Sequence, residues 1–241
     1  LNDGMNRDEK TAKRFAEQAM CSSHLEHPAI AATYSSGVLL GKRPYIAMEL
    51  LSGITLRALV KDEGGLSPDL VVRIFSQVCE GLEHAHKHGV VHKNLKASNI
   101  YVCKDTKASA STAKIVDFGL AERLFRDLTW EQQATRTGSV YGDVESMCPE
   151  YVRATQPNEV SDIYTMGCGM YEAISGQRIF AQETQMALVV AHMNEKPAPF
   201  KDRLSVPEPL AAVVFRCLQK DPSDRFQSAA HVKEALQLCL V

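Results

Sequence analysis

The pattern of apolar and polar positions changes character after the first fifty residues. Two short apolar runs, Gly37–Leu40 and Tyr45–Leu51, are separated by Gly41-Lys42-Arg43, which predicts a hairpin of two strands. Ahead of them, helix-forming residues from Asp8 to Glu26 predict a helix that closes at His27-Pro28, because proline cannot continue a helix. This part of the chain therefore predicts one helix and a small antiparallel sheet.

Helical spacing dominates the rest of the chain. Ser67-Pro68-Asp69 is a helix start signal, since serine can cap, proline suits the first helical position and aspartate favours the positive dipole end. Apolar residues then recur on one face until Gly89, where this helix is predicted to end. Further helices are predicted over Asp162–Ile174, Gln185–Met193, Pro209–Gln219 and Ser228–Leu240, and short strands on both sides of Asn99 and before Asp117.

Composition narrows the class of protein. The chain of 241 residues is 45% hydrophobic with a formal net charge of −2, enough for one domain or two unequal lobes. That charge balance lacks the excess of basic residues that is typical of nucleic-acid-binding domains. No apolar run approaches the roughly 20 residues of a membrane span. The seven cysteines are scattered and never form C-x-x-C, which favours free thiols in a reducing compartment. With no signal-peptide pattern, a cytoplasmic location is expected.

One stretch, "VVHKNLKASNIYV" from Val90 to Val102, is dense in polar groups between apolar flanks. It contains His92, Asn94, Lys96 and Asn99. A buried strand would not hold these side chains, and a solvent loop would not have such apolar flanks. The pattern indicates a loop fixed between two core elements, with its polar groups positioned for chemistry.

Five motifs follow one another in order, and together they are specific although each alone is weak. They are "HKNLKASN", "KIVDFGLA" (Lys114–Ala121), "CPE" (Cys148–Glu150), "SDIYTMGCGMYEAISG" (Ser161–Gly176) and "KDPSDRF" (Lys220–Phe226). Over nearly its whole length, the chain resembles the eukaryotic-like (Hanks-type) serine/threonine protein kinase family, in its bacterial branch. The resemblance implies an α+β bilobal fold. Residues 1–50 would form a partial N-lobe, with helix C and short antiparallel strands, and residues 51–241 a mainly helical C-lobe.

The resemblance also implies ATP and Mg²⁺ as cofactors, and residues that position them for phosphoryl transfer. Asp117 would hold magnesium between the ATP phosphates, and Asn99 a second magnesium. Lys96 would contact the moving phosphate. The nucleotide would be bordered by Met48, Glu49, Leu51, Tyr101 and Asp117.

Structural roles follow from the same resemblance. Glu150 and Arg225 would form a buried ion pair, and Asp162 would brace the backbone of the loop that contains His92. Each residue also has a simpler alternative, in which Asp117 caps a turn or Glu150 is solvated, but the joint pattern favours the kinase fold.

The loop departs from the family at its central position. Family members have H-R-D-L-K, whose aspartate accepts the proton of the substrate hydroxyl or aligns that hydroxyl, whereas this chain has Asn94. An amide has neither the basic lone pair nor the charge of a carboxylate. General-base catalysis contributes about 10²–10⁴ in rate, or about 3–5 kcal/mol of barrier. The sequence therefore predicts a retained scaffold that has lost its acid–base residue.

Other departures point the same way. Asp143 stands at the threonine of the family's G-T-x-x-Y, here Gly-Asp-Val-Glu-Ser, where it could pair with Lys96 and obstruct the substrate hydroxyl. Gln18 takes the position of the helix C glutamate, with Glu17 rotated about 100° away on a helix. Tyr101 replaces an aliphatic residue, where it would narrow the adenine pocket or stack on adenine.

The Gly-rich phosphate loop and the V-A-I-K strand are missing altogether. The opening "LNDGMNRDEKTAKRF" looks like the family segment that follows the lysine strand, so the chain is expected to begin partway through a kinase domain.

A cluster of histidines raises a metal-binding alternative. His84 and His88 have the i, i+4 spacing that zinc sites use on a helix, but H-E-x-x-H is absent and His86 would point to another face. His86 and His92 match ordinary positions of the family pattern, which favours structural histidines.

The interpretation favoured by these features is a pseudokinase domain that binds or regulates protein partners, with no nucleic acid and no membrane span in this segment. The alternative is an active serine/threonine kinase that acts on a protein substrate and whose missing strands lie upstream. A third possibility is a non-functional gene fragment.

Overall fold

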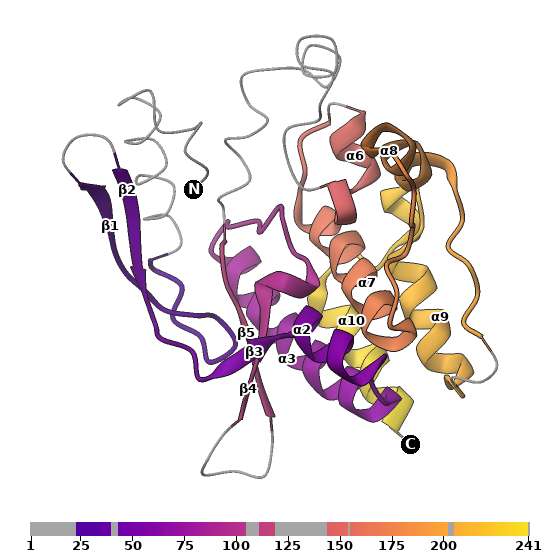
Figure 1. The fold of residues 1–241 in the computed structure, drawn as a ribbon, viewed down its shortest axis with the longest axis horizontal. Coiled ribbons are helices and arrows are strands. Elements are labelled where there is room, and N and C mark those ends of the chain that lie inside the picture. The colour runs from indigo at the N-terminus through magenta and orange to yellow at the C-terminus, as the bar shows by residue number, and fades with distance from the viewer. Residues whose placement is uncertain are drawn as a thin grey trace.

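The computed structural model describes residues 23–39, 43–104, 111–118, 144–153, 155–201 and 205–240. A strand hairpin lies on one side of the molecule and the helices lie on the other, with a second small sheet between them (Figure 1). This arrangement matches the predicted α+β architecture of a partial N-lobe and a helical C-lobe.

The hairpin consists of β1 (Thr33–Leu39) and β2 (Arg43–Met48), which pair antiparallel as predicted. Gly37 lies opposite Tyr45, whose ring covers it so closely that an added Cβ would stand 2.8 Å from a ring carbon. A larger residue at position 37 would therefore require the Tyr45 ring to move.

The helix predicted over Asp8–Glu26 is wrong in its last residues. Residues 8–22 lie outside the described part of the chain, and Ser23–Glu26 form a turn and irregular backbone. The backbone N–H of Ala29 donates to Nδ1 of His27 at 3.1 Å, and that of Ile30 to the His27 carbonyl at 3.0 Å. These bonds form a separate turn around Pro28, which disfavours helical backbone in the residue before it.

The second sheet contains β3 (Gly53–Thr55), β4 (Ile100–Lys104) and β5 (Ser111–Ile115), antiparallel in the order β3-β4-β5. A parallel bridge between Ile30 and Ile115 joins this sheet to the segment before the hairpin. In that bridge, Ala31 N–H donates to the Ile115 carbonyl at 2.9 Å. The connection ties the small lobe to the core of the large one.

Strands follow Asn99 and precede Asp117 as predicted, but the strand predicted before Asn99 is wrong. A 3-10 turn, η2 (Ala97–Asn99), stands there instead. It is closed by the Asn99 N–H, which donates to the Lys96 carbonyl at 2.8 Å. A tight turn suits the polar side chains of this loop better than an extended strand does.

Helix α3 (Pro68–Lys87) begins as its sequence predicts, with the Ser67 side chain as N-cap and Pro68 in the first turn. The four helices predicted after Gly89 are present, with ends shifted by a few residues, and two short helices, α2 and α6, were not predicted. The helices are α2 (Leu56–Glu63), α6 (Pro149–Val152), α7 (Glu159–Ser175), α8 (Gln185–Asn194), α9 (Glu208–Cys217) and α10 (Ala229–Gln237), with 3-10 turns η3 (Val144–Ser146), η5 (Pro222–Asp224) and η6 (Leu238–Leu240).

Helix α7 is the centre of the core, because it is buried on almost every side. Gly167 lets α9 approach it closely, since an added Cβ would stand 2.9 Å from Cβ of Cys217. Helix α10 packs along α3, and α3 packs on β5. Helix α7 also contacts η2, the turn within the polar loop.

Beyond the bridge at Ile115, the edge of β5 at Ser111–Ala113 is covered by a side chain. Gln77 on α3 accepts from the Ala113 N–H at 3.0 Å and donates to the Ser111 carbonyl at 3.2 Å. An amide side chain reproduces the donor and acceptor of a neighbouring strand, which satisfies this sheet edge.

The described helices include none with the length and apolar character needed to cross a membrane.

Candidate active site

Asp162, in the first turn of α7, holds the backbone of the polar loop through hydrogen bonds. Its carboxylate is fully buried and accepts the backbone N–H of His92 at 2.7 Å and that of Lys93 at 2.8 Å. Nε2 of His86 lies 2.8 Å from the same carboxylate. A buried carboxylate is stable only with such partners, so these bonds fix the loop backbone to the central helix.

His92 connects the loop to the segment that contains Asp117. Its Nδ1 accepts the backbone N–H of Asn94 at 3.2 Å, so Nε2 carries the proton and donates to the Val116 carbonyl at 3.0 Å. Burial lowers the pKa of His92, which agrees with a neutral ring. The ring also lies 4.6 Å from that of Phe118, between centroids. The loop and the D-F-G segment are therefore coupled through one histidine.

The two asparagines of the loop lie together. Nδ2 of Asn99 donates to the backbone carbonyl of Asn94 at 3.0 Å, and Asn99 is only 6% exposed. The Asn99 carbonyl accepts the Val116 N–H at 3.0 Å, which brings Asn99 next to the residue before Asp117. Lys96 is half-buried at the start of the intervening turn. Asn94, Asn99 and the Asp117 segment thus form one compact constellation.

Two residues in or next to this constellation have strained backbone. Lys93 has φ of 66° and Asp117 has φ of 65°, values that are uncommon for residues other than glycine. Asp162 holds the N–H of Lys93, and both backbone groups of Val116 are hydrogen-bonded beside Asp117. Strain of this kind persists where the surroundings fix the backbone, and it is concentrated at functional sites.

The joint between hairpin and second sheet is fixed by Glu49. Its carboxylate binds Nζ of Lys114 at 2.9 Å and accepts the Ala32 N–H at 3.2 Å. Burial alone would raise the pKa of Glu49, but the hydrogen bonds from Lys114 and Ala32 lower it overall.

The other predicted nucleotide-binding residues lie around this joint. Tyr101, on β4, is half-buried and pairs with Lys114 across the β4–β5 register. Met48 is 38% exposed at the end of β2, and Leu51 is half-buried beyond Glu49. The nucleotide-binding role of this set stays a prediction.

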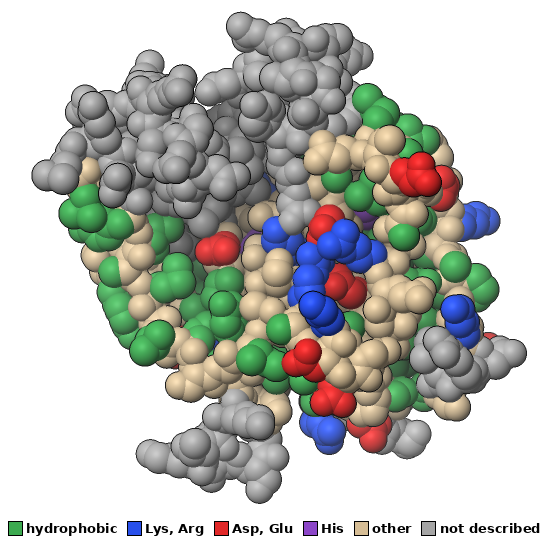
Figure 2. All heavy atoms as spheres, in the orientation of Figure 1, with side chains coloured by type: hydrophobic (Ala, Val, Ile, Leu, Met, Phe, Trp, Pro, Cys, Tyr) green, Lys and Arg blue, Asp and Glu red, His purple; other side chains and the backbone are tan. Residues whose placement is uncertain are grey.

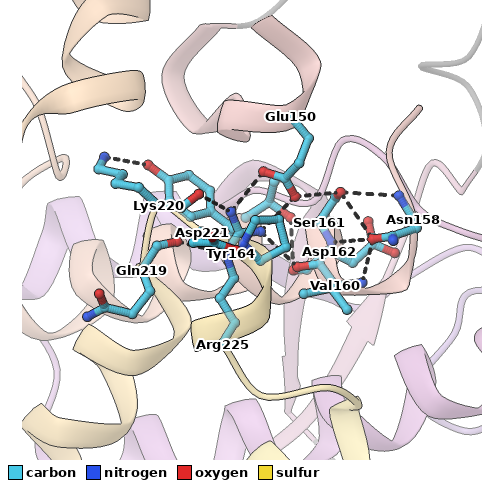
Figure 3. A network of polar contacts seen from close by, with 12 residues as sticks. Glu150, Asn158, Val160, Ser161, Asp162, Tyr164, Gln219, Lys220, Asp221 and Arg225 are labelled. Carbon is cyan, nitrogen blue, oxygen red and sulfur yellow. Dashed lines mark hydrogen bonds and ion pairs between the residues drawn. The ribbon is translucent and has the colours of Figure 1, made fainter. Parts of the chain in front are cut away.

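Glu150 and Arg225 form a bidentate ion pair inside the helical lobe, with N–O distances of 2.7 and 2.8 Å (Figure 3). Arg225 is 1% exposed and also donates to the Gln219 carbonyl at 2.7 Å. The Ser161 hydroxyl donates to Glu150 at 2.9 Å. Burial alone would raise the pKa of Glu150, but the hydrogen bonds and the charge of Arg225 lower it overall. The pair joins α6 to the turn before α10.

Two predicted site residues, Gln18 and Asp143, lie outside the described residues. The loss of the helix C glutamate and the pairing of Asp143 with Lys96 therefore stay predictions.

The histidines near the end of α3 have different surroundings. His86 turns to Asp162, as its predicted separate face requires. The ring centroids of His84 and His88 lie 4.4 Å apart with tilted planes, and the ring centroid of His27 lies 5.2 Å from that of His84. Within the described residues, no group of three or more His, Cys, Asp or Glu side chains is arranged to hold a metal ion.

A charged cluster beside the loop was missed from the sequence. Arg57 on α2 forms a bidentate pair with Glu172 on α7, at 2.9 and 3.1 Å, although 115 residues separate them. Glu145 binds both Arg57 and Arg178. No local pattern marks such residues, because their partners are distant in the sequence.

The chain is similar to known proteins over nearly all of its length. The model of the protein kinase domain matches residues 2–237. Serine/threonine-protein kinase PknB of Mycolicibacterium smegmatis is 33% identical over 98% of this chain and 37% of the relative. PknB of Mycobacterium tuberculosis is 31% identical over the same shares, 98% and 37%. The probable PknB of Corynebacterium glutamicum is 32% identical over 96% of this chain and 36% of the relative.

The chain thus spans little more than a third of the length of these relatives. Among solved structures, the crystal structure of Rad53 1-466 in complex with AMP-PNP matches with a TM-score of 0.72, at 24% identity, over 94% of this chain and 54% of that one. This likeness supports the fold alone. The chain therefore belongs to the protein kinase domain family, in its Hanks-type serine/threonine branch.

Proposed function

We propose that this chain is a catalytically impaired member of the family, a pseudokinase domain that acts in signalling by binding or regulating protein partners. One observation carries the proposal. Asn94 occupies the loop position of the family's proton-accepting aspartate, while the hydrogen bonds around that position are intact.

The argument rests on the difference between an amide and a carboxylate. Asn94 can hold a hydroxyl by a hydrogen bond, but it cannot take up the proton that leaves this hydroxyl during transfer. A missing general base costs about 10²–10⁴ in rate, which equals about 3–5 kcal/mol of barrier. Turnover would then be close to background, while the surfaces that bind partners would be unaffected.

Residual binding of ATP and Mg²⁺ is compatible with the same site. Carboxylate and amide oxygens suit Mg²⁺, and Asp117 and Asn99 supply one of each. The bond from Nδ2 of Asn99 to the Asn94 carbonyl orients the amide, which leaves Oδ1 as the end available for a cation. A bound Mg²⁺ would neutralise phosphate charge.

The predicted boundary between the partial N-lobe and the C-lobe lies between residues 50 and 51. Among the contacts that cross this boundary are the Ile30–Ile115 bridge and the Glu49–Lys114 ion pair. Both join the partial N-lobe to β5, the strand that leads to Asp117. Strand β5 would thus set the position of a nucleotide bound near Glu49 relative to Asp117.

The second candidate is an active serine/threonine kinase whose remaining N-lobe strands lie upstream. The strained backbone of Lys93 and Asp117 favours it, because backbone strain of this kind is concentrated at functional sites.

Phosphate transfer by the full-length protein decides between the two. We expect ATP-dependent phosphorylation of a generic protein substrate to be no faster in the wild type than in Asp117→Ala. Activity well above that variant would establish the active kinase and end the pseudokinase assignment.

A further inference from the structure

Three histidine rings from two separate segments meet at the end of α3. His84 lies in the last turn of this helix, His88 caps it, and His27 comes from the turn around Pro28. The ring of His84 is in the middle, with centroids 5.2 Å from His27 and 4.4 Å from His88. Because His27 belongs to the partial N-lobe and α3 to the C-lobe, this histidine cluster of His27, His84 and His88 spans the boundary between the lobes.

The turn around Pro28 contacts both α3 and β5. A Cβ added at Gly81 on α3 would stand 3.2 Å from the carbonyl oxygen of Ala29 and 3.3 Å from its Cβ, so helix and turn touch there. The same Ala29 carbonyl accepts the Ile115 N–H at 2.8 Å, and the Ala31 N–H donates to the Ile115 carbonyl at 2.9 Å. A change in how the turn packs on α3 would therefore also reach β5.

The central ring of the cluster is suited to the neutral state. Nε2 of His84 is buried, and it has no hydrogen-bond partner in the described part of the chain. Both nitrogens of an imidazolium carry protons, so a charged His84 would bury an N–H donor without an acceptor. A buried donor left unsatisfied is unfavourable. A proton on His84 therefore opposes the packing seen here.

The charges around His84 act in the same direction. Burial lowers the pKa of His84, and the nearby His88, His27 and Lys87 lower it further. Where Lys and Arg side chains gather on the face drawn in Figure 2, acidic side chains lie among them. Among the described residues, the charged groups that act on His84 are instead all bases. Glu83, which adjoins His84 in the sequence, forms an ion pair with Lys87 at 3.3 Å.

His27 has charges of both signs around it. Burial lowers the pKa of His27, the carboxylate of Glu80 on α3 partly offsets this, and the charge of Lys114 on β5 lowers the pKa again. Glu80 is itself bound to Lys233 on α10 at 2.7 Å. The pKa of His27 is lowered overall, so both rings of the contact between the lobes are harder to protonate than in an unfolded chain.

A proton on His27 would also remove a hydrogen bond of the turn. In the neutral ring, Nδ1 of His27 accepts the Ala29 N–H at 3.1 Å. In the imidazolium this nitrogen becomes a donor, and two N–H groups would then face each other. Acid therefore weakens the turn itself and its contact with α3 at the same time.

We propose that the histidine cluster is a pH-sensitive contact between the lobes, in which neutral rings hold the turn around Pro28 on α3 and protons on His27 and His84 release it. Release would also loosen β5, because the turn bonds to Ile115. The inference goes beyond the proposed function and does not depend on phosphate transfer.

The direction of the pH dependence follows from the two lowered pKa values. A group whose pKa is lower in the folded protein binds its proton more readily in the released state, so acid favours release. The contact is complete above 6.5, the ordinary pKa of histidine, and is lost as the pH falls below it. This range includes the pH values at which histidine acts as a switch in proteins.

Hydrogen–deuterium exchange of the full-length protein, without nucleotide, at about pH 8 and about pH 5 tests the release. The amides of Ala31 and Ile115 report on the turn, and those of α7 report on unfolding of the whole domain. After correction for the intrinsic effect of pH on exchange, protection of Ala31 and Ile115 should fall about fivefold or more relative to α7. Unchanged protection, or an equal loss in α7, would overturn the proposal.

His84→Gln distinguishes protonation from packing. Glutamine keeps a hydrogen-bonding side chain but takes up no proton in this range, so the loss of protection at the lower pH should shrink by about half or more. His231→Gln, at an exposed position on α10, is the matched control and should respond as the wild type does. A full response in His84→Gln contradicts the proposal, with thermal unfolding at about pH 8 confirming that both variants are folded.

An NMR titration of the histidine rings tests the wild type without any substitution. The rings of His27 and His84 should take up their protons at lower pH in the folded protein than in the protein unfolded by urea. If both rings titrate at the same pH in the two states, protons cannot drive release and the proposal is wrong. Neither measurement involves ATP, so its failure would leave the pseudokinase assignment untouched.

Discussion

The side-chain amide of Asn99 holds the backbone carbonyl of Asn94, not its side chain, at 3.0 Å. The backbone N–H of Asn94 is held in turn by the His92 ring at 3.2 Å. The conformation of the loop is therefore maintained by backbone contacts at position 94. This separates the scaffold of the site, which is retained, from the group that would perform proton transfer.

The first prediction is that Asn94→Asp leaves stability nearly unchanged. The substitution preserves size and both backbone bonds, so the free energy of unfolding should change by no more than about 0.5 kcal/mol. Urea unfolding of both proteins measures it. A loss of several kcal/mol would show that the amide side chain itself supports the loop.

The second prediction concerns Asp162. Asp162→Ala leaves the N–H groups of His92 and Lys93 and the ring of His86 without their buried acceptor. Unfolding free energy should fall by roughly 3–5 kcal/mol, as when one partner of a buried charged network is removed. Asp69→Ala, at an exposed position on α3, is the matched control. Equal losses in the two variants would refute the bracing role.

The third prediction concerns the ion pair of Glu150 and Arg225. Arg225→Met strands a buried carboxylate and should cost roughly 3–5 kcal/mol. The double variant with Glu150→Gln should lose less than the sum of the single losses, because the charge is then also removed. Lys87→Met, which breaks the exposed Lys87–Glu83 pair, should cost less than about 1 kcal/mol. The prediction is contradicted if Arg225→Met and Lys87→Met lower the free energy of unfolding, measured with urea, by the same amount.

The fourth prediction is acid destabilisation through His192. Burial lowers the pKa of His192 from 6.5 to about 4 in the folded protein. Between these values the unfolded state binds more protons, so stability is full above pH 6.5 and is lost as the pH falls toward 4. The loss from this residue is at most about 3 kcal/mol, and His92, whose pKa burial also lowers, acts in the same direction.

Unfolding free energy measured at intervals from pH 7 to pH 4 tests this dependence. His192→Gln removes the titrating ring, and the slope against pH should become shallower even though the variant is less stable throughout. His231→Gln, at an exposed position, is the control and should keep the wild-type slope. An unchanged slope in His192→Gln would assign the acid sensitivity to other groups.

Local signals in the sequence predicted much of the fold. Ser67-Pro68 fixed the start of α3 because a side-chain cap and a proline act within one turn. The hairpin followed from apolar runs around a glycine, and the motifs identified Asp162, Glu150 and Arg225 through resemblance. The end of the first predicted helix was wrong, because the bonds around Pro28 that form a separate turn depend on the His27 side chain.

Contacts between distant parts of the chain were not predictable from a single sequence. Gln77, on α3, covers part of the edge of β5. Nothing in the sequence around Gln77 indicates that the edge of a strand lies beside it. The same holds for Arg57, whose two acidic partners come from η3 and α7. Such residues look like ordinary surface polar groups until the fold brings them together.

The most direct test of the central claim is the initial rate of phosphate transfer from ATP to a serine peptide, compared between the wild-type protein and Asn94→Asp. Asp117→Ala gives the baseline. If the missing proton acceptor limits the reaction, the wild type stays at the baseline and Asn94→Asp exceeds it by about a hundredfold or more. A wild type that turns over at the roughly 1–100 s⁻¹ of ordinary kinases, with no gain in Asn94→Asp, would contradict the account.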